Sequence, residues 1–275
     1  MTDQATKAKT FQTLHQEGCF VLPNPWDAGS AKILEGLGFA ALATTSAGFA
    51  RSTGVDDYEL TRDQVLTHAA DLCAASSLPI SADLENGFGH RPEDCHETIT
   101  RAAEAGLVGG SIEDFSGEPG QQYPLEDAKE RVTAAVEAAR AQPFPFTLTA
   151  RAENFFTGTP DLADTIARLQ AYQDAGADVL YAPGLKSIED VKTVISSVDR
   201  PVNVLLGPQA GLRPVAELAR LGVRRVSVGA VLANIAMDAL IKAGEELLAT
   251  GTFGFLEDTY GSDRITELMF ARPRP

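Results

Sequence analysis

The sequence predicts a (β/α)8 barrel with an additional C-terminal helical segment, and three observations support this fold. Short apolar runs alternate eight times with amphipathic helical stretches over about 250 of the 275 residues, which is the size and count of such a barrel. Several helical stretches end in a glycine, as a C-terminal helix cap requires: Gly38, Gly106, Gly176 and Gly222. Polar residues suited to chemistry follow many of the runs, which favours a closed barrel over an open doubly wound sheet.

The first half of the chain contributes four of the expected strand–helix units. Short apolar runs predict buried strands over residues 19–23, 40–45, 78–84 and 109–113. Amphipathic stretches predict helices over residues 28–37, 62–75, 92–105 and 125–141. Asp27 is a candidate N-cap of the first helix. Glycine and serine between the second strand and its helix predict a loop.

The second half repeats the pattern and adds an extension. Strands are expected over residues 146–152, 177–182, 201–206 and 223–228, and helices over 162–175, 187–198, 213–221 and 230–249. No linker or break in composition divides the chain, so residues 1–275 form a single expected domain. Residues 252–275 are too apolar for a free tail. We expect this extension to dock on a neighbouring subunit, with its own barrel as the simpler alternative.

Composition excludes several classes of partner. The net charge of −15 and a pI near 4.7 disfavour nucleic acid and anionic membranes, which require a basic surface. The three cysteines show no CxxC spacing, which indicates reduced thiols in a cytoplasmic protein. The first ten residues lack the apolar stretch of a signal peptide, and no apolar run is long enough to span a membrane.

Carboxylates directly follow the third and fourth expected strands. Asp83 and Glu85 are two residues apart, so they would point to the same face of an extended strand, and Glu113 ends the next strand. Acids that converge at neighbouring strand ends repel one another unless a cation lies between them. Oxygen ligands suit a hard cation such as Mg²⁺. The simpler alternative is that these are ordinary polar residues at strand ends.

Other strand ends supply candidate contacts for a small acid. They are Thr45, Ser46, Ala47, Arg151, Tyr181 and Asn203. Small and hydroxyl residues can present backbone N–H groups to a carboxylate, and a guanidinium can hold one in a fork. With a cation, these groups suit a reaction that passes through an enolate. Gly229 and Gly207 could form a phosphate site or simply make tight turns, whereas Lys186 lies too far past its strand for a Schiff base.

Four segments resemble the isocitrate lyase/phosphoenolpyruvate mutase superfamily, and the resemblance covers roughly residues 15–250. They are Ala82-Asp83-Leu84-Glu85-Asn86-Gly87-Phe88-Gly89, Ser111-Ile112-Glu113-Asp114, Thr149-Ala150-Arg151 and Val226-Ser227-Val228-Gly229. The resemblance implies a (β/α)8 barrel that uses Mg²⁺, with Mn²⁺ as a possible substitute. It further implies C–C or P–C bond chemistry through an enolpyruvate-like intermediate. A homo-oligomer, dimer or tetramer, in which paired subunits exchange a C-terminal helix, is also implied.

The resemblance also assigns roles to individual residues. Asp83 is similar to the direct metal ligand, Glu85 and Glu113 to ligands that act through waters, and Asp57 to the acid that completes the shell. Thr45, Ser46 and Ala47 fall where the family holds the carboxylate of a 2-oxo acid, and Arg151 falls on its arginine clamp.

The loop after the fourth strand departs from the family. Residues 115–123 contain neither the Lys-Lys-Cys-Gly-His motif of the lyases nor the lysine and asparagine of the phosphonomutases. Glu118 is the candidate catalytic acid or base of this loop, whose two glycines and proline could make it a mobile lid.

The sequence therefore favours a Mg²⁺-dependent lyase that acts on a small 2-oxo or 2-hydroxy di- or tricarboxylic acid, by C–C cleavage or decarboxylation. A phosphonate-directed enzyme acting at a P–C bond is the first alternative. A non-catalytic protein that binds 2-oxo acids is the second.

Overall fold

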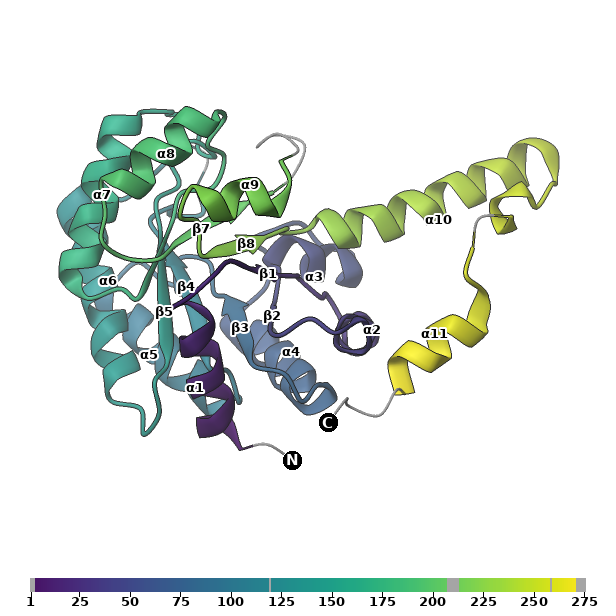
Figure 1. Ribbon diagram of the computed structural model, residues 1–275, viewed down its shortest axis with the longest axis horizontal. Helices are drawn as coiled ribbons and strands as arrows, with labels where there is room; N and C mark the ends of the chain where they lie inside the picture. The colour runs from purple at the N-terminus through teal and green to yellow at the C-terminus, as the bar shows by residue number, and fades with distance from the viewer. Residues whose placement is uncertain (1–2, 119, 207–212, 258, 271–275) are drawn as a thin grey trace.

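The computed structural model describes residues 3–118, 120–206, 213–257 and 259–270. Eight parallel strands form one sheet in the order β1-β8-β7-β6-β5-β4-β3-β2 (Figure 1). Their bounds are β1 Phe20–Leu22, β2 Leu42–Ala43, β3 Ile80–Asp83, β4 Gly109–Glu113, β5 Thr147–Arg151, β6 Val179–Tyr181, β7 Val202–Leu205 and β8 Arg225–Ser227. Across the remaining seam, Ala43 N–H donates to the Pro23 carbonyl at 3.1 Å. The predicted (β/α)8 barrel is confirmed.

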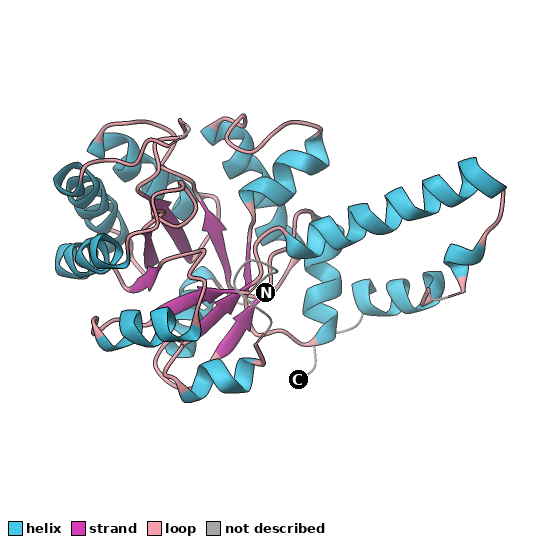
Figure 2. Cartoon of the chain, turned by 90° about the horizontal axis from the view of Figure 1, so that it is seen from above, coloured by secondary structure: helices cyan, strands magenta, loops and turns pink. Residues whose placement is uncertain are grey.

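Helices surround the strands on the outside of the barrel (Figure 2). Their bounds are α1 Gln4–Leu14, α2 Ala28–Leu37, α3 Ser46–Thr53, α4 Arg62–Ala75, α5 Pro92–Glu104, α6 Leu125–Arg140, α7 Leu162–Ala175, α8 Ile188–Ser196, α9 Val215–Arg220, α10 Val231–Thr250 and α11 Gly261–Phe270, with a 3-10 turn η1 at Gly254–Leu256. The observed strands are mostly a few residues shorter than expected. No helix in the described ranges combines the length and apolar character that crossing a membrane requires.

Two helices were absent from the sequence prediction. The prediction of a loop directly after the second strand is wrong, because the helix α3 begins there. Thr45 is its N-cap, and Thr45 Oγ1 accepts a hydrogen bond from Gly48 N–H at 3.3 Å. The N-terminal segment forms α1, which packs Phe11 against the barrel and holds its place through Gln4 Nε2, bonded to the carbonyls of Ala103 and Leu107. Since these carbonyls lie just before β4 begins, α1 covers the amino end of the barrel.

The interior beneath the carboxyl-end mouth is polar. Arg225 is 4% exposed and donates to Asn203 Oδ1 at 2.9 Å and to Thr149 Oγ1 at 3.0 Å. The Nη1 atom of Arg225 lies 3.4 Å from Nε2 of His15. His15 directly follows α1, and its ring packs edge-on against the rings of Phe11 and Phe20. A charged arginine is therefore satisfied by neutral partners inside the barrel.

His15 predicts a loss of stability in acid. Burial, together with the charge of Arg225, lowers the pKa of His15 to about 3, so the folded chain keeps it neutral. The unfolded chain protonates this residue below about pH 6.5, so the free energy of unfolding falls as the pH drops from there towards 3. We expect His15→Leu to remove about 2 kcal/mol of the difference in stability between pH 7 and pH 5. Urea titrations at the two pH values measure it.

A control for this prediction is His96→Leu, at an exposed histidine of α5. It should keep the stability difference of the parent chain. If His15→Leu also keeps that difference, His15 is not the group that titrates.

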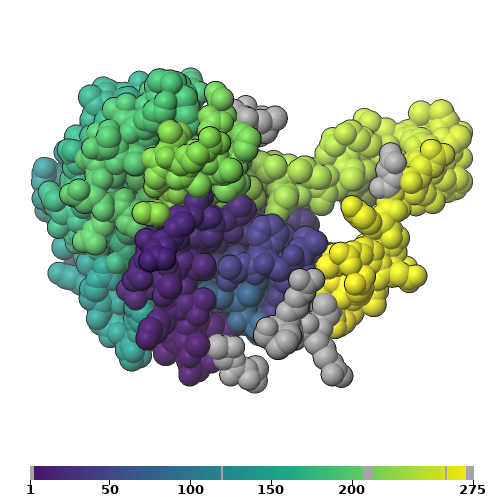
Figure 3. Space-filling view, in the orientation of Figure 1, coloured from purple at the N-terminus to yellow at the C-terminus, as the bar shows by residue number. Residues whose placement is uncertain are grey.

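The C-terminal part of the chain forms an arm. In Figures 1 and 3, α10 extends away from the barrel, and α11 returns to lie near α2. The return contact is close, because a Cβ added at Gly36 of α2 would lie 2.2 Å from the Leu268 carbonyl oxygen of α11. The extension thus packs on its own barrel in the single chain, and its docking on a neighbouring subunit stays a prediction. Positions 258 and 271–275 of the expected extension lie outside the described residues.

Candidate active site

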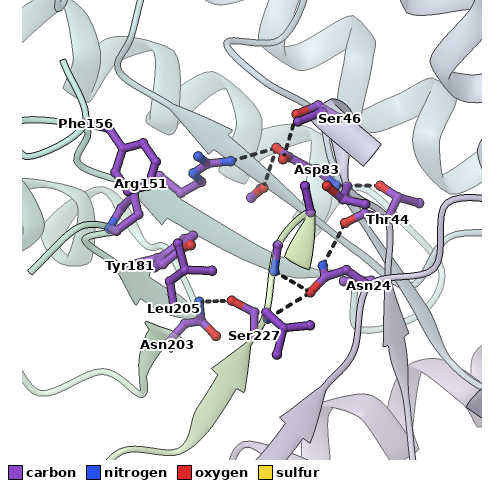
Figure 4. A pocket seen from close by; sticks show the side chains of 18 of the residues that line it. Asn24, Thr44, Ser46, Asp83, Arg151, Phe156, Tyr181, Asn203, Leu205 and Ser227 are labelled. Carbon is purple, nitrogen blue, oxygen red and sulfur yellow. Dashed lines mark hydrogen bonds and ion pairs between the residues drawn. The ribbon is translucent and has the colours of Figure 1, made fainter. Parts of the chain in front are cut away.

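A cavity of about 780 Å³ opens at the carboxyl ends of the strands, where barrel enzymes carry their sites. Figure 4 shows side chains that line it, from β3 through β8 and from the segments after β1 and β2. The sequence candidates among its lining residues are Thr45, Ser46, Ala47, Asp57, Asp83, Arg151, Tyr181 and Asn203. The structure thus brings most of the candidates together in one place.

Arg151 is the centre of the charged cluster. Its guanidinium pairs with Asp83 Oδ1 at 2.7 Å, Glu113 Oε2 at 2.9 Å and Glu153 Oε1 at 2.8 Å. It also lies 5.2 Å from the centre of the Tyr181 ring. A guanidinium therefore already lies between two of the acids that the sequence analysis placed around a metal ion. Glu153 was not among the residues predicted from the sequence. The signal that could have found it is its position two residues after Arg151, the spacing at which side chains of a strand point to the same face.

Hydroxyl groups contact two of the three acidic residues that pair with Arg151. Ser46 Oγ donates to Asp83 Oδ2 at 3.2 Å, and Asp83 N–H donates to Thr44 Oγ1 at 2.9 Å. The phenol of Tyr58 donates to Glu113 Oε1. Tyr58 has a left-handed φ of 66°, and no sequence signal marked it, because its role depends on reaching Glu113 from a distant loop.

The prediction that Glu85 and Asp83 point to the same face of an extended strand is wrong. β3 ends at Asp83, and Glu85 adopts a left-handed φ of 49°, so the two acids do not share the face of an extended strand. Glu85 is nevertheless buried beside the cluster. Burial, with the charges of Asp83 and Asp57, raises its pKa to about 8.

Asp57 is a second acid whose pKa is raised in the folded chain. Its Oδ1 is buried and has no hydrogen-bond partner. Burial, followed by the charge of Asp83, raises the pKa of Asp57. An orphaned buried carboxylate oxygen is costly and indicates an absent partner at this position.

The donor chemistry of this cluster fits a hard cation. Five carboxyl groups lie around the single guanidinium of Arg151, and when ionised their negative charge exceeds its positive charge: Asp57, Asp83, Glu85, Glu113 and Glu153. Oxygen donors of this kind suit Mg²⁺ or Mn²⁺. Within the described part of the chain, however, no three acidic, histidine or cysteine side chains stand in an arrangement ready to hold a metal ion. Ligation by these residues therefore requires side-chain movement or bridging waters.

The first turn of α3 provides donors beside these acids. The Thr45 hydroxyl is engaged as the N-cap, and the Ser46 hydroxyl is engaged with Asp83. The backbone N–H groups of a first helical turn have no partner within the helix. They suit a carboxylate, which agrees with the contacts predicted for residues 45–47.

Asn24 and Asn203 hold the opposite wall of the cavity in place. Asn24 donates to the Thr44 carbonyl at 2.9 Å, and its Oδ1 accepts from the N–H groups of Val228 and Gly229 at 3.0 and 2.9 Å. The Gly229 amide is thus already used, which favours the tight-turn interpretation over a phosphate site. Gly207, the other half of that prediction, lies outside the described residues. Asn203 donates to Ser227 Oγ at 2.9 Å.

The loop after β4 is anchored at its base. Phe115 and Gln122 form an antiparallel bridge, and Tyr123 N–H donates to the Asp114 carbonyl at 2.8 Å. Glu118 is exposed and lines a surface hollow with His90, outside the central cavity. The structure does not bring Glu118 to the other candidates, so its catalytic role stays a prediction. Lys186 is exposed, as its dismissal as a Schiff-base lysine anticipated.

Comparisons with known proteins agree with this geometry. The family model for phosphoenolpyruvate phosphomutase matches residues 11–248. An uncharacterized protein of Mycobacterium tuberculosis is 34% identical over 225 residues, which cover 81% of this chain and 82% of the relative. An oxaloacetate decarboxylase of Pseudomonas putida is 27% identical, with 86% and 81% covered. The crystal structure of a Burkholderia cenocepacia protein, whose lyase or mutase activity is itself inferred, has a TM-score of 0.94 at 54% identity and covers 98% of this chain and 97% of its own.

The barrel, the charged cavity at its mouth and these relatives define an enzyme of the carbon–carbon lyase and mutase class. The chain belongs to the phosphoenolpyruvate phosphomutase family, within the superfamily that its sequence segments resemble.

Proposed function

We propose that this enzyme is a Mg²⁺-dependent lyase that breaks a C–C bond in a small 2-oxo or 2-hydroxy acid through an enolate. One observation carries the proposal: Arg151 and Asp83 line the cavity beside the first turn of α3, and the buried Glu113 pairs with the same guanidinium behind them. The relationship to an oxaloacetate decarboxylase supports the same class of substrate.

Arg151 keeps donors available for a substrate carboxylate. A guanidinium has five N–H groups, and three of them are engaged with Asp83, Glu113 and Glu153. In the proposed complex, the two remaining N–H groups pair with a substrate carboxylate that the amides of residues 45–47 hold from the other side. The carboxylate pairs fix the guanidinium plane, so the substrate is oriented at little further entropic cost.

Asp83, with Asp57, Glu85 and Glu113, would hold the metal ion. When bound, the ion supplies positive charge against the negative charge that develops on the 2-oxygen of the substrate. The orphaned Oδ1 of Asp57 and the raised pKa of Glu85 support this role for the acids.

We further propose a cytoplasmic homo-oligomer built through the arm. Large apolar side chains of the arm are exposed, including Leu240 at 73% and Leu248 at 92% of α10 and Phe253 at 63% before η1. Several large apolar side chains exposed on one projecting segment favour association with another protein surface. All three cysteines are free, which supports a reducing compartment.

A turnover panel with Mg²⁺ tests the proposed function. Oxaloacetate, isocitrate, 2-methylisocitrate, malate homologues, phosphonopyruvate and phosphoenolpyruvate are offered, and pyruvate, glyoxylate and phosphate are followed. We expect product from a carboxylic acid, and Asp83→Ala should abolish both this turnover and Mg²⁺-dependent ligand binding by calorimetry, because it removes the central acid of the cluster.

Asp63→Ala is the matched control, since Asp63 also pairs with an arginine but lies 78% exposed on α4. It should keep full turnover. Activity on phosphonates alone would instead identify a P–C bond enzyme. Unchanged ligand affinity in Asp83→Ala would refute the assignment of the metal site, and binding without any turnover would support the non-catalytic alternative.

A further inference from the structure

The central cavity is divided into two chemically different sectors. The acids and their hydroxyl partners come from β3, β4 and the segments that follow β2. The apolar part of the lining comes from the segments after β5 and β6 and from the end of β7: Phe156, Pro183, Leu205 and Leu206, with the polar Glu153, Thr157 and Asn203 beside them. Figure 4 shows Phe156 and Leu205 on the side of the cavity away from Ser46 and Thr44. A ligand held by the acids therefore meets an apolar wall on its other side.

Backbone contacts hold this wall in place. The Phe156 ring lies so close to Gly184 that a Cβ there would meet its Cδ2 at 2.8 Å, and Gly184 has a left-handed φ of 83°. Leu205 likewise lies against Gly229, where a Cβ would meet its Cδ1 at 3.3 Å. Phe156 is nevertheless 51% exposed. A large ring that is fixed at a cavity mouth and half exposed gains free energy when a ligand covers it.

The basic side chains that could pair with a second substrate carboxylate do not lie on the apolar wall. Among the described residues that line the cavity, the basic side chains are Arg51, Arg151 and Arg225. Arg225 is buried among neutral partners, and Arg51 reaches from α3 to Asn234 of α10. The apolar wall thus offers no charge to a second anionic group.

From this arrangement we infer that the substrate carries an alkyl group, in place of a further carboxylate, on the side that faces Phe156 and Leu205. The inference rests on the proposed function, because it assumes that the acids and Arg151 hold the 2-oxo acid portion. Its physical basis is the free energy of transfer from water. Moving an alkyl group from water to this apolar surface is favourable, whereas moving a carboxylate there is unfavourable because no cation or hydrogen-bond donor replaces its water.

Calorimetry in the presence of Mg²⁺ tests the inference with 2-oxo acids as probes. Pyruvate, 2-oxobutanoate and 2-oxopentanoate should bind with affinities that rise by up to about fourfold for each added methylene. The isopropyl compound 5-methyl-2-oxohexanoate should bind more tightly than 2-oxoglutarate, which has a carboxylate of similar shape at the same place. In Phe156→Ala, the affinity ratio of 5-methyl-2-oxohexanoate to pyruvate should fall about tenfold.

Phe253→Ala is the matched control, because Phe253 is similarly exposed but lies in the arm, and it should leave that ratio as in the parent. Tighter binding of 2-oxoglutarate, or an unchanged ratio in Phe156→Ala, would overturn the inference while leaving the proposed function standing. Absence of Mg²⁺-dependent binding of pyruvate and of every longer acid would overturn the proposed function and the inference together.

Discussion

Replacing Arg151 with lysine is expected to lower kcat/KM by about a hundredfold to a thousandfold, because a lysine cannot hold three carboxylates and a substrate in one plane. The ammonium keeps the positive charge between Asp83 and Glu113, so the fold survives. Removal of the charge in Arg151→Met would strand these buried acids at a cost of about 3–5 kcal/mol, and is therefore a less specific test. Steady-state kinetics on the acid that the panel identifies measures the loss.

Arg140→Lys is the matched control for this prediction. Arg140 also forms a forked pair, with Asp178 at 2.7 and 3.1 Å, but it ends α6 at the opposite end of the barrel. Its replacement should leave kcat/KM unchanged. If Arg151→Lys retains the activity of the parent enzyme, the guanidinium does not orient the substrate.

Replacing Asp114 with alanine is expected to destabilise the fold by about 3–5 kcal/mol, which is a large share of the stability of a typical domain. Asp114 is 3% exposed and its carboxylate accepts four hydrogen bonds. The donors are Tyr172 Oη at 2.5 Å, Arg168 at 3.1 Å, and Gln122 and the Glu153 N–H at 2.9 Å each. Alanine leaves all of these donors buried without this acceptor.

Chemical denaturation monitored by circular dichroism measures the change in the free energy of unfolding. The surface pair of Asp63 with Arg101 supplies the comparison, because Asp63→Ala should cost no more than about 1 kcal/mol. A loss in Asp114→Ala that is as small as this would show that the network around Arg168 contributes little. The variant should also lower activity, since Gln122 and Glu153 connect Asp114 to the loop after β4 and to Arg151.

Helix ends were predictable where local chemistry determines them. The predicted bounds of α2, α4 and α7 are those of the structure. Asp27 caps α2 as expected, Thr61 and Gln64 form a capping box at α4, and Gly176 ends α7 in the left-handed conformation. These signals involve residues within one turn of each other, so a single sequence contains them in full.

Elements that depend on distant contacts were not predictable in this way. The helix α1 buries only Ala8 and Phe11 of its own length, and its position depends on carbonyl groups about a hundred residues away. The helix α3 begins within the predicted loop, because nothing local distinguishes Thr45 as a cap from a loop threonine. In both cases tertiary packing, rather than local preference, decides the conformation.

The sequence by itself determined the barrel and the side chains that meet at its mouth. In a parallel barrel all carboxyl ends of the strands face the same way, so Asp83, Glu113 and Arg151 had to converge once the strands were recognised. Only the tertiary structure decided their partners. It placed Tyr58 and Asn24 at the site, turned Glu85 out of the strand, put the Arg151 guanidinium between the acids and left an apolar wall opposite them. These features depend on distances between residues far apart in the chain, which the order of residues does not contain.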